Sequence, residues 1–387
     1  MEECKSTKIE KGEHAKAGVD YQKIEPFKQA MIKVGKKTLN FPNSRGVFIS
    51  EEVLHAHGAV YEYRGPWTHK WCKTTEGLGN KNWIAEWMRH FAGTGRSYYD
   101  GIGIDTALMA VNDLIAQGAM PVIYTDEVAA GDSDWFKDKK RSADLARGFY
   151  AVCKMVGMAL PAGESPSLRY LIKSEPPVQS APSLSGCVTG IIAPANRLIT
   201  GRKLRIGDHI LAAKSSGLHA NGVSLVIKRA LVQPDKFLTK LPNNNNTLGE
   251  EALIPTRSYV ALVEAMLENE VDIHALLPGT GSGLAKIAFD ERGYSYHIKS
   301  WFDEIPPLFQ FMLDIGVSLE DCLTTFNMGG GYYVYFSPEE VDSTIEIGRK
   351  AGYEIIDVGV VEKGDRKVVI NPGLFNKDGI ILPPPGE

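Results

Sequence analysis

The alternation of helical and extended patterns along most of the chain constrains the fold more than any other sequence feature. From about residue 100 to residue 370, apolar residues repeat at helical spacing and then form short continuous runs typical of buried strands. The clearest helix follows Pro255, where the apolar residues between Tyr259 and Leu267 form a stripe along one face. Chains that interleave helices and strands form α/β folds. We therefore expect an α/β protein with mixed sheets.

The positions of these patterns also divide the chain into two halves. We expect helices over 104–115, 142–157, 259–267 and 338–352, and strands over 121–125, 187–192, 209–213, 331–336 and 367–370. The segment Pro194-Ala195-Asn196 interrupts the alternation and is typical of a join. A chain of 387 residues is also long enough for about two or three domains. We therefore expect two domains, residues 1–195 and 196–387.

Charge and cysteine content exclude several classes of protein. The chain has 43 Lys and Arg against 47 Asp and Glu, a net charge of −4 without a long basic run, so we expect neither nucleic acid nor an anionic membrane as partner. The longest uncharged stretch, 176–196, contains four prolines and cannot be a lipid-facing helix. Residues 1–5 have no apolar core of a secretory signal, and the five cysteines form no C-x-x-C pair. We expect a soluble, cytoplasmic protein that acts on a small molecule.

The first segment that could carry chemistry is Glu76-Gly77-Leu78-Gly79-Asn80-Lys81. A Gly-x-Gly pair lets the backbone approach a phosphate closely, and the lysine that follows supplies a positive charge. A simple turn explains the same glycines equally well. The segment is therefore a candidate nucleotide loop that needs support from other parts of the chain.

The second segment places acids and an amide on a helix. Asp105 and Asn112 are seven residues apart, which is about two helical turns, so they share one face, and Asp113 lies beside it. Carboxylate oxygens on an otherwise apolar helix favour a Mg²⁺ ion held next to nucleotide phosphates. The alternative is a solvated face with no ligand.

The third group of acids follows the strand expected at 121–125. Asp126 stands at the predicted exit of this strand, and Gly163-Glu164 comes later in the chain. Ligand sites of α/β proteins are usually built at strand ends. For acids such as Glu164, the alternative is that the side chain only caps the next helix.

The fourth segment, 215–222, is a loop of small residues that contains His219 and Asn221 and precedes a helical run from Val223. Free N–H groups and the dipole at a helix N-terminus favour an anion such as phosphate. His219 could equally be a structural histidine. Because the chain lacks a G-x-x-x-x-G-K-[ST] loop and a G-x-G-x-x-G fingerprint, any ATP site must depend on carboxylate-held metal and less common loops.

Taken in order, these segments resemble the aminoimidazole ribonucleotide synthetase family, also called phosphoribosylformylglycinamidine cyclo-ligases. The resemblance extends from about residue 17 to residue 369. Its strongest blocks are 103–109, 111–114, 117–121, 215–225, 255–260, 272–275 with 280–283, and 325–331.

The resemblance implies a fold and an activity. It implies a homodimer whose N-terminal domain, 1–195, binds ATP and forms a barrel across the interface with its sheet, and a C-terminal α/β domain, 196–387. The family uses ATP and Mg²⁺ to phosphorylate the amide oxygen of formylglycinamidine ribonucleotide, after which an internal nitrogen closes the imidazole ring and expels phosphate. The implied partner is thus a small phosphoribosyl amide.

The resemblance also implies roles for individual residues. Metal ligands would be Asp113, Asp126 and Glu164, and catalytic roles would fall to His219, Asn221 and Lys81. Residues in contact with the cofactor would be Glu76, Gly77, Gly79, Asn112, Asp113, Asp126, Gly163, Glu164, Thr256, Arg257 and Thr280.

This chain departs from the family pattern at several positions. Glu76 stands where the family has Asp, Asn80 where it has Thr, and 162–167 reads Ala-Gly-Glu-Ser-Pro-Ser where the family has Gly-Gly-Glu-Thr-Ala-Glu. The family's N-terminal Gly-rich stretch is replaced by 43–50. These departures keep two alternatives open: another ATP-dependent kinase or synthetase of the superfamily, such as a thiamine-phosphate kinase, or a nucleotide-binding paralogue without turnover.

Overall fold

The computed structural model describes residues 17–50, 58–242, 244–375 and 378–386. Residues 1–5, on which the expectation of no secretory signal rests, lie outside these ranges. Within the described part of the chain, no helix combines the length and the apolar character needed to cross a bilayer.

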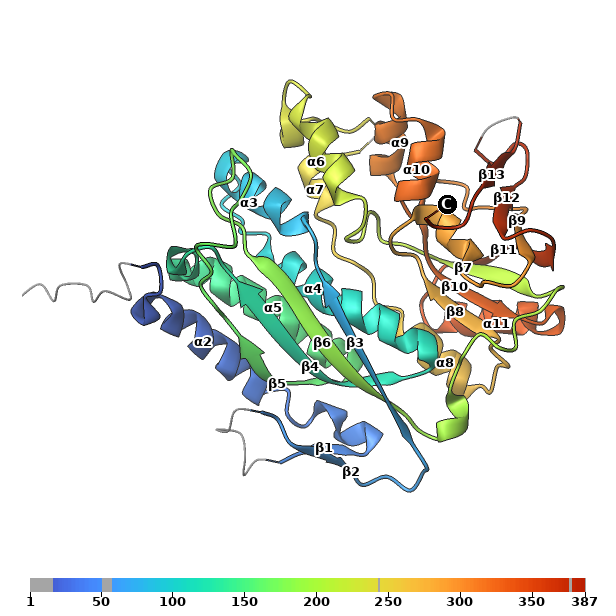
Figure 1. Cartoon of the computed structure of the whole chain (residues 1–387), viewed down its shortest axis with the longest axis horizontal. Helices are drawn as coiled ribbons and strands as arrows, with labels where there is room; N and C mark the ends of the chain where they lie inside the picture. Colours follow the sequence, from blue (N-terminus) through green and yellow to red (C-terminus); the bar gives the residue numbers. More distant parts are fainter. Residues whose placement is uncertain (1–16, 51–57, 243, 376–377, 387) are drawn as a thin grey trace, which may run out of the picture.

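Two large β-sheets divide the molecule (Figure 1). The first has the order β3 (Lys70–Gly77), β6 (Ser183–Ile192), β4 (Met120–Ala129) and β5 (Ala159–Glu164). The second has the order β13 (Ile380–Leu382), β12 (Lys367–Ile370), β9 (Tyr294–Ile298), β11 (Ile355–Lys363), β7 (His209–Lys214), β10 (Gly330–Phe336) and β8 (Ala275–Pro278). Each sheet mixes parallel and antiparallel neighbours. The expectation of a mixed α/β fold with two domains is confirmed.

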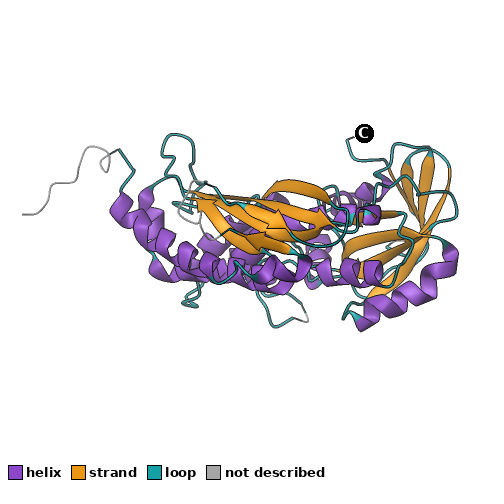
Figure 2. Cartoon of the chain, turned by 90° about the horizontal axis from the view of Figure 1, so that it is seen from below, coloured by secondary structure: helices purple, strands orange, loops and turns teal. Residues whose placement is uncertain are grey.

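Helices cover one face of the four-stranded sheet (Figure 2). Helix α4 (Tyr99–Leu114) contacts β3, β6 and β4, and α5 (Lys139–Val156) lies against α4. Nearly all of α4 is buried because it packs between the sheet and its neighbours. Helix α2 (Tyr21–Lys36) lies beside α5 and β5, and α3 (Lys81–Phe91) follows directly after β3.

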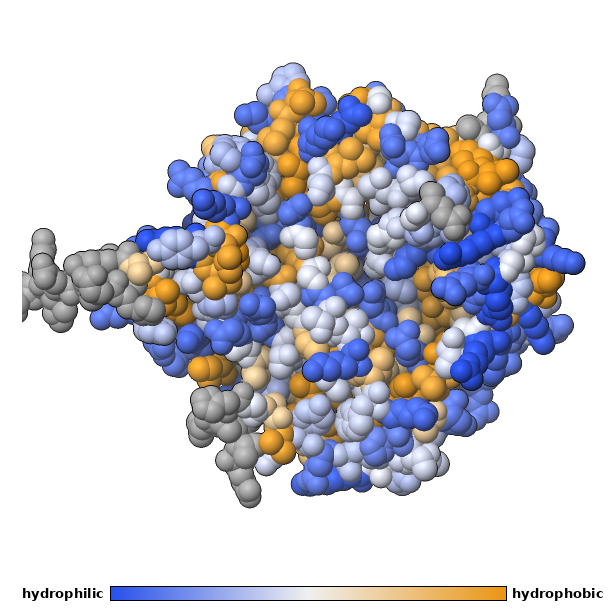
Figure 3. All heavy atoms as spheres, viewed as in Figure 1, coloured by the Kyte–Doolittle hydropathy of each residue, from blue (hydrophilic) through white to orange (hydrophobic). Residues whose placement is uncertain are grey.

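The opposite face of this sheet is largely open. Trp71, Lys73 and Thr75 alternate along β3 with inward residues, and all three are exposed. A small hairpin of β1 (Val47–Ile49) and β2 (Tyr61–Tyr63) covers one end, where Val47 packs on the sheet. Figure 3 shows a pale central region with apolar atoms in separate patches, and no single large apolar area.

The second half of the chain contains the remaining described helices. They are α6 (Val223–Leu231), α7 (Leu248–Ala252), α8 (Val260–Glu268), α9 (Pro307–Asp314), α10 (Leu319–Thr325) and α11 (Val341–Lys350). Of these, α11 packs on β11 and β7 of the seven-stranded sheet. The helix expected over 338–352 starts as a short 3₁₀ turn, Pro338–Glu340, before α11 begins. The strand expected over 121–125 continues to Ala129, so Asp126 lies inside β4 and not at its exit, which corrects our prediction.

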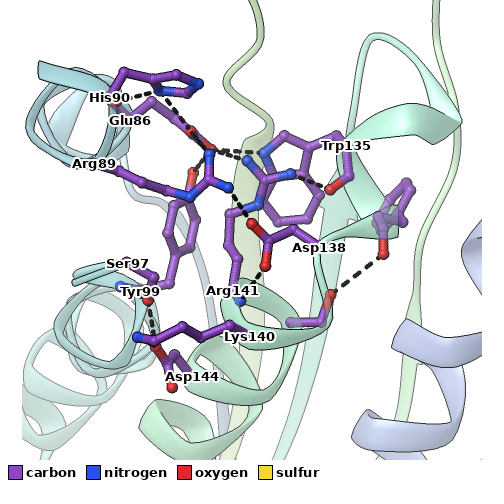
Figure 4. A network of polar contacts seen from close by, with 12 residues as sticks. Glu86, Arg89, His90, Ser97, Tyr99, Trp135, Asp138, Lys140, Arg141 and Asp144 are labelled. Carbon is purple, nitrogen blue, oxygen red and sulfur yellow. Dashed lines mark hydrogen bonds and ion pairs between the residues drawn. The ribbon is translucent and has the colours of Figure 1, made fainter. Parts of the chain in front are cut away.

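A buried polar network fixes α3 against the helices beneath it (Figure 4). The fully buried Glu86 of α3 accepts hydrogen bonds on Oε1 from Tyr99 of α4 (2.8 Å), from the indole N–H of Trp135 (2.9 Å) and from Arg141 of α5 (2.7 Å). A buried carboxylate with three donors and a cationic partner is stable because its charge is compensated. This network therefore fixes the helix that begins where the candidate nucleotide loop ends.

Candidate functional site

The polar face of α4 binds the segment 254–259 of the other half of the chain. Asp105 and Lys81 are fully buried, and 2.8 Å separate Lys81 Nζ from Asp105 Oδ2. Asp105 Oδ1 accepts from the Thr256 backbone N–H (2.7 Å) and hydroxyl (2.5 Å), and Lys81 donates to the Ile254 carbonyl (2.8 Å). These contacts form a closed polar junction between the two domains.

Asn112 extends the same junction by two turns of helix. Its amide donates to the Arg257 carbonyl (2.9 Å) and accepts from the Tyr259 backbone N–H (3.1 Å). The Arg257 side chain turns away, donates to the Gly352 carbonyl (2.6 Å) and stacks on the Tyr353 ring.

These contacts involve four residues for which we predicted a cofactor contact or a catalytic role. Because Lys81 is buried and its charge is taken up by Asp105, it presents no ammonium group to a phosphate in this structure. Asn112 and Thr256 use their polar atoms within the junction, and Arg257 uses its guanidinium at Gly352. The polar atoms of Lys81, Asn112 and Thr256 are thus used at the domain junction, and the Arg257 guanidinium is used within the second domain. The ligand contacts expected of these residues stay predictions.

Asp113, at the end of α4, points elsewhere. Its Oδ1 is buried and makes no hydrogen bond within the described residues. Together with Lys286 of the 3₁₀ helix Gly283–Ala288 it lines a cavity of about 440 Å³, whose other walls include Gln117, Thr200 and Pro278. The Asp113 carboxylate and the Lys286 ammonium group form no ion pair within 4.0 Å. The cavity therefore lies beside two opposite charges that do not touch each other.

Burial dominates the electrostatics of this pair. It raises the pKa of Asp113 from 3.8 to about 6; Lys286 acts to lower that pKa and Glu76 of β3 to raise it. Burial also lowers the pKa of Lys286, against the opposing effects of Asp113 and Glu76. Two carboxylates and one lysine thus interact through space while none is neutralised by direct contact.

Further polar groups surround these charges. Lys286 donates to the Thr280 hydroxyl, and Asn221 lies next to Gly281, whose ideal Cβ position is 3.7 Å from the Asn221 amide oxygen. Burial raises the pKa of Tyr332 well above its usual value, and Asp113 raises it further. The Tyr332 hydroxyl and the Asn221 amide nitrogen are both buried without a hydrogen-bond partner within the described structure.

We call the group formed by Glu76, Asp113, Asn221, Thr280, Lys286 and Tyr332 the junction cleft; two of its members, Asp113 and Lys286, line the cavity of about 440 Å³. Three of its members have buried polar atoms with unused hydrogen-bonding capacity, which native proteins seldom leave unsatisfied. Carboxylate oxygens are the ligands that Mg²⁺ prefers, and a lysine and an amide are suitable donors for phosphate oxygens. The residues present therefore fit a magnesium-bound polyphosphate.

The glycine loop ahead of α3 borders this cleft. Gly79 has φ +73°, a left-handed conformation that favours glycine, and an added Cβ would meet nothing within 4 Å. Asn80 reaches across to Ser224 at the start of α6 (2.9 Å), which places the loop opposite the second domain. Gly77 is exposed and leaves the loop backbone accessible next to Glu76.

His219 lies close to the cleft but is buried as a neutral group. Burial, followed by the charges of Lys81 and Arg257, lowers its pKa to about 3. The Ser216 backbone N–H donates to His219 Nε2 at 3.4 Å, so this nitrogen is an acceptor that closes the loop 215–222. A neutral imidazole keeps one N–H donor on its other ring nitrogen, and the catalytic role expected for His219 stays a prediction.

Asp126 and Glu164 lie in a different cavity. Both line the space beneath α2 together with Gly163, whereas Asp113 lines the cavity at the domain junction. Across the described residues, no group of three or more His, Cys, Asp or Glu side chains is arranged to hold a metal ion. Within the described part of the single chain, Asp113, Asp126 and Glu164 therefore do not converge on one ion as predicted.

Sequence reasoning missed two members of the cleft. Lys286 follows the small-residue segment Thr280–Gly283 by three positions, and that spacing was a usable signal. Tyr332 is part of an apolar strand and gave no signal of its own. Both acquire their position from contacts between segments far apart in the sequence.

Comparisons with known proteins match both halves of the chain. Residues 59–192 match the family model of the N-terminal domain of AIR synthase related proteins, and residues 205–371 match the model of the C-terminal domain. The phosphoribosylformylglycinamidine cyclo-ligase of Pyrococcus horikoshii is 31% identical over 92% of this chain and 97% of its own length. That of Lactobacillus acidophilus is 32% identical over 92% of this chain and 99% of its own.

Solved structures share the fold at lower identity. Hydrogenase maturation protein HypE in complex with ATP superposes with a TM-score of 0.59 at 16% identity, over 86% of this chain and 88% of that one. Thiamine-monophosphate kinase from Stenotrophomonas maltophilia superposes with a TM-score of 0.56 at 16% identity, over 88% and 96%. At this level of identity the similarity concerns the fold alone.

Proposed function

This chain belongs to the AIR synthase related family, and on that premise we propose that it closes the imidazole ring of formylglycinamidine ribonucleotide. The products would be aminoimidazole ribonucleotide, ADP and phosphate, in a step of purine biosynthesis. The observation that carries the proposal is the identity of about 31% to relatives named cyclo-ligases, which spans nearly the full length of both chains.

The chemistry requires activation of an unreactive group. An amide oxygen is a poor leaving group, and ATP, when bound with Mg²⁺, supplies the phosphoryl group that turns it into a good one. Ring closure then forms one C–N bond and breaks one C–O bond, and phosphate departs with the former amide oxygen. The protein has to hold the reacting groups in line and keep water away from them.

We assign this positioning to the junction cleft. Glu76 and Asp113 would hold Mg²⁺, and Lys286 would face the phosphate oxygens. The unpartnered groups of Asn221 and Tyr332 would donate to the substrate or to the transferred phosphate. Thr280 keeps Lys286 oriented through their hydrogen bond. Glu76 is one methylene longer than the aspartate of the family pattern, which moves its carboxylate by about 1 Å and affects how closely it approaches the metal.

The test is a product assay with a matched variant. Purified protein with ATP, Mg²⁺ and formylglycinamidine ribonucleotide should release ADP and aminoimidazole ribonucleotide in equal amounts. Lys286→Met should lower kcat/KM by about 100-fold, because it removes a positive charge aimed at developing negative charge. Lys228→Met is the control, since Lys228 is exposed on α6, and it should leave the rate unchanged.

The second candidate is an ATP-dependent kinase or synthetase of the same superfamily with a different acceptor. The departure at Ala162–Ser167 favours it, because that segment differs from the cyclo-ligase pattern at four of its positions. ADP release that depends on another small molecule, and not on formylglycinamidine ribonucleotide, would replace the cyclo-ligase assignment. Binding of ATP without turnover would favour a silent paralogue.

We also propose that the chain acts as a homodimer through the open face of its four-stranded sheet. The face of the sheet that carries the exposed Trp71 of β3 is not covered by helices, which leaves it accessible to a second copy of the chain. Sedimentation equilibrium should give twice the mass of 42.4 kDa. Trp71→Lys should return the monomer mass, while Trp67→Lys, outside the sheet, should not.

A further inference from the structure

A third cavity lies beside the segment 193–203, which connects the two halves of the chain. It has a volume of about 580 Å³, and its other main wall is the turn 267–274 between α8 and β8. Trp67, which is 59% exposed, completes the lining. None of the residues for which we predicted a catalytic or cofactor role lines this cavity. We call it the connector pocket.

Much of the lining of the connector pocket is apolar. Ile199 comes from the connecting segment, and Leu267, Val271 and Ile273 come from the turn after α8. Cavities of about 300–1,000 Å³ with apolar walls and a few polar groups are typical of small-molecule sites. The charged groups of the lining therefore decide which class of molecule fits.

Three of the five ionisable side chains in this lining already have partners. Asp272 forms an ion pair with Lys203, and its second oxygen lies 3.4 Å from His274 Nε2. His274 is 3% exposed, and its Nδ1 contacts the buried carboxylate of Asp208 at 2.7 Å. These groups compensate one another within the protein and need no ligand.

The remaining cation of the lining is Arg197. Its side chain is half-buried, and its guanidinium makes no hydrogen bond or ion pair with any residue that the structure describes. The backbone around it is fixed, because the Arg197 N–H donates to the Pro194 carbonyl (3.0 Å) and the Ile199 N–H to the Gln117 carbonyl (3.1 Å). The guanidinium is therefore presented from a rigid segment, and its paired N–H donors match a carboxylate.

The remaining anion is Glu270, which occupies an unfavourable position. It follows the C-terminal end of α8 with φ +56°, a left-handed conformation that favours glycine. A negative charge at this place also faces the negative end of the helix dipole. Within the described parts of the chain the Glu270 carboxylate has no hydrogen bond or ion pair. Strain of this kind is typical of residues that serve a ligand, and a cationic group bound by the carboxylate would account for it.

The two unpaired charges come from the two segments that form the walls of the pocket. Arg197 and Glu270 form no ion pair within 4.0 Å, so each remains available to a ligand. A ligand with a negative charge alone would be repelled by Glu270, and one with a positive charge alone by Arg197. A ligand that carries both charges satisfies both residues.

We propose that the connector pocket binds an α-amino acid with an apolar side chain. Arg197 binds its carboxylate and Glu270 its ammonium group, while its side chain packs against Trp67 and the apolar lining. The proposal does not depend on the function proposed above.

L-Phenylalanine is the probe that tests the proposal. Titration calorimetry of the full chain at pH 7.5 should show one site. N-acetyl-L-phenylalanine lacks the ammonium group, and L-phenylalaninamide lacks the carboxylate. Each should bind at least about 10-fold more weakly than L-phenylalanine, because each leaves one charge of the pocket without its partner.

Two variants assign the charges to individual residues. Arg197→Gln should weaken L-phenylalanine binding by about 10-fold or more, but it should bind L-phenylalaninamide as the unchanged protein does, since that ligand has no carboxylate to lose. Glu270→Gly should weaken L-phenylalanine binding and yet raise the thermal midpoint, because glycine adopts a positive φ without strain. Arg202→Gln and Glu268→Gln are the matched controls: both side chains are exposed outside the lining, and both variants should bind like the unchanged protein.

Three outcomes would overturn the proposal. They are equal affinity for L-phenylalanine and either derivative, unchanged affinity in Arg197→Gln or in Glu270→Gly, and no binding of L-phenylalanine at millimolar concentration. If Arg197→Gln fails to fold, Glu270→Gly supplies the test, because its gain in stability and its loss of binding have opposite signs. Since none of these readouts uses ATP or formylglycinamidine ribonucleotide, failure here is distinguishable from failure of the cyclo-ligase assignment.

Discussion

Replacement of Asp113 by asparagine tests two effects of the buried carboxylate separately: its effect on the stability of the fold and its effect on the binding of Mg-ATP. Burial raises the pKa of Asp113 from 3.8 to about 6. Each unit of pKa difference between folded and unfolded states corresponds to about 1.4 kcal/mol. The ionised carboxylate therefore destabilises the fold at neutral pH by about 3 kcal/mol.

The sign of the pH dependence follows from the direction of the pKa change. Below pH 3.8 the carboxyl group is protonated in both states and costs nothing. As pH rises from 3.8 to about 6, the unfolded chain releases its proton more readily than the folded one, and the stability of the protein falls. Asp113→Asn removes this loss. Its thermal midpoint should therefore exceed that of the unchanged protein at pH 7.5 by about 2–6 °C, and the difference should vanish near pH 4.

Differential scanning fluorimetry at pH 4.0 and pH 7.5, with and without Mg-ATP, measures both effects. Mg-ATP should raise the midpoint of the unchanged protein and leave that of Asp113→Asn nearly unaltered, because the variant lacks a hard ligand for the metal. Asp303→Asn, at an exposed acid, should behave like the unchanged protein in all conditions. A lower midpoint for Asp113→Asn at pH 7.5, or a difference of equal size at pH 4.0, would refute the reasoning.

Three further predictions concern buried groups. Lys81→Met should lower the free energy of unfolding by about 3–5 kcal/mol in urea because it leaves Asp105 unpaired, and adding Asp105→Asn should restore part of the loss; a change below 1 kcal/mol would argue against the junction. The His219 imidazole should stay neutral from pH 8 down to about pH 4 in NMR titration, as its pKa near 3 implies, and a midpoint near 6 would contradict its burial. Glu86→Gln should cost about 2–4 kcal/mol, since Arg141 loses its charged partner, whereas Glu62→Gln on the exposed hairpin should cost almost nothing.

The fold class was predictable because helical and extended periodicities are local properties. The stripe from Tyr259 to Leu267 predicts α8 to within a residue or two, and the run ending at Gly157 predicts α5. The strand that contains Asp126 was predicted in the correct part of the chain, but its predicted end at residue 125 comes before the observed end at Ala129. Its last residues, Glu127 to Ala129, include a charge that interrupts the apolar run even though the backbone continues to pair with β6.

The candidate site was less predictable because partners come from distant segments. Asp105 and Asn112 were rightly placed on one helix face, but their actual partners, Thr256 and Tyr259, lie 151 and 147 positions away. Sequence spacing within a helix cannot reveal which backbone will pack against it. The resemblance to the family assigned Asp113 and Asp126 to one metal site, whereas the helix and the strand that carry them place them in different cavities of this chain.

The contact between Asp105, Lys81 and Thr256 has a consequence for recombination between relatives. A chimera that takes its first half from one homologue and its second half from another inherits Asp105 and Lys81 from one parent and the residue at 256 from the other. Any parent with an apolar residue at 256 would leave the acid without the hydroxyl it binds. Half-chain exchange should therefore give folded protein only between parents that agree at these three positions, whatever their similarity elsewhere.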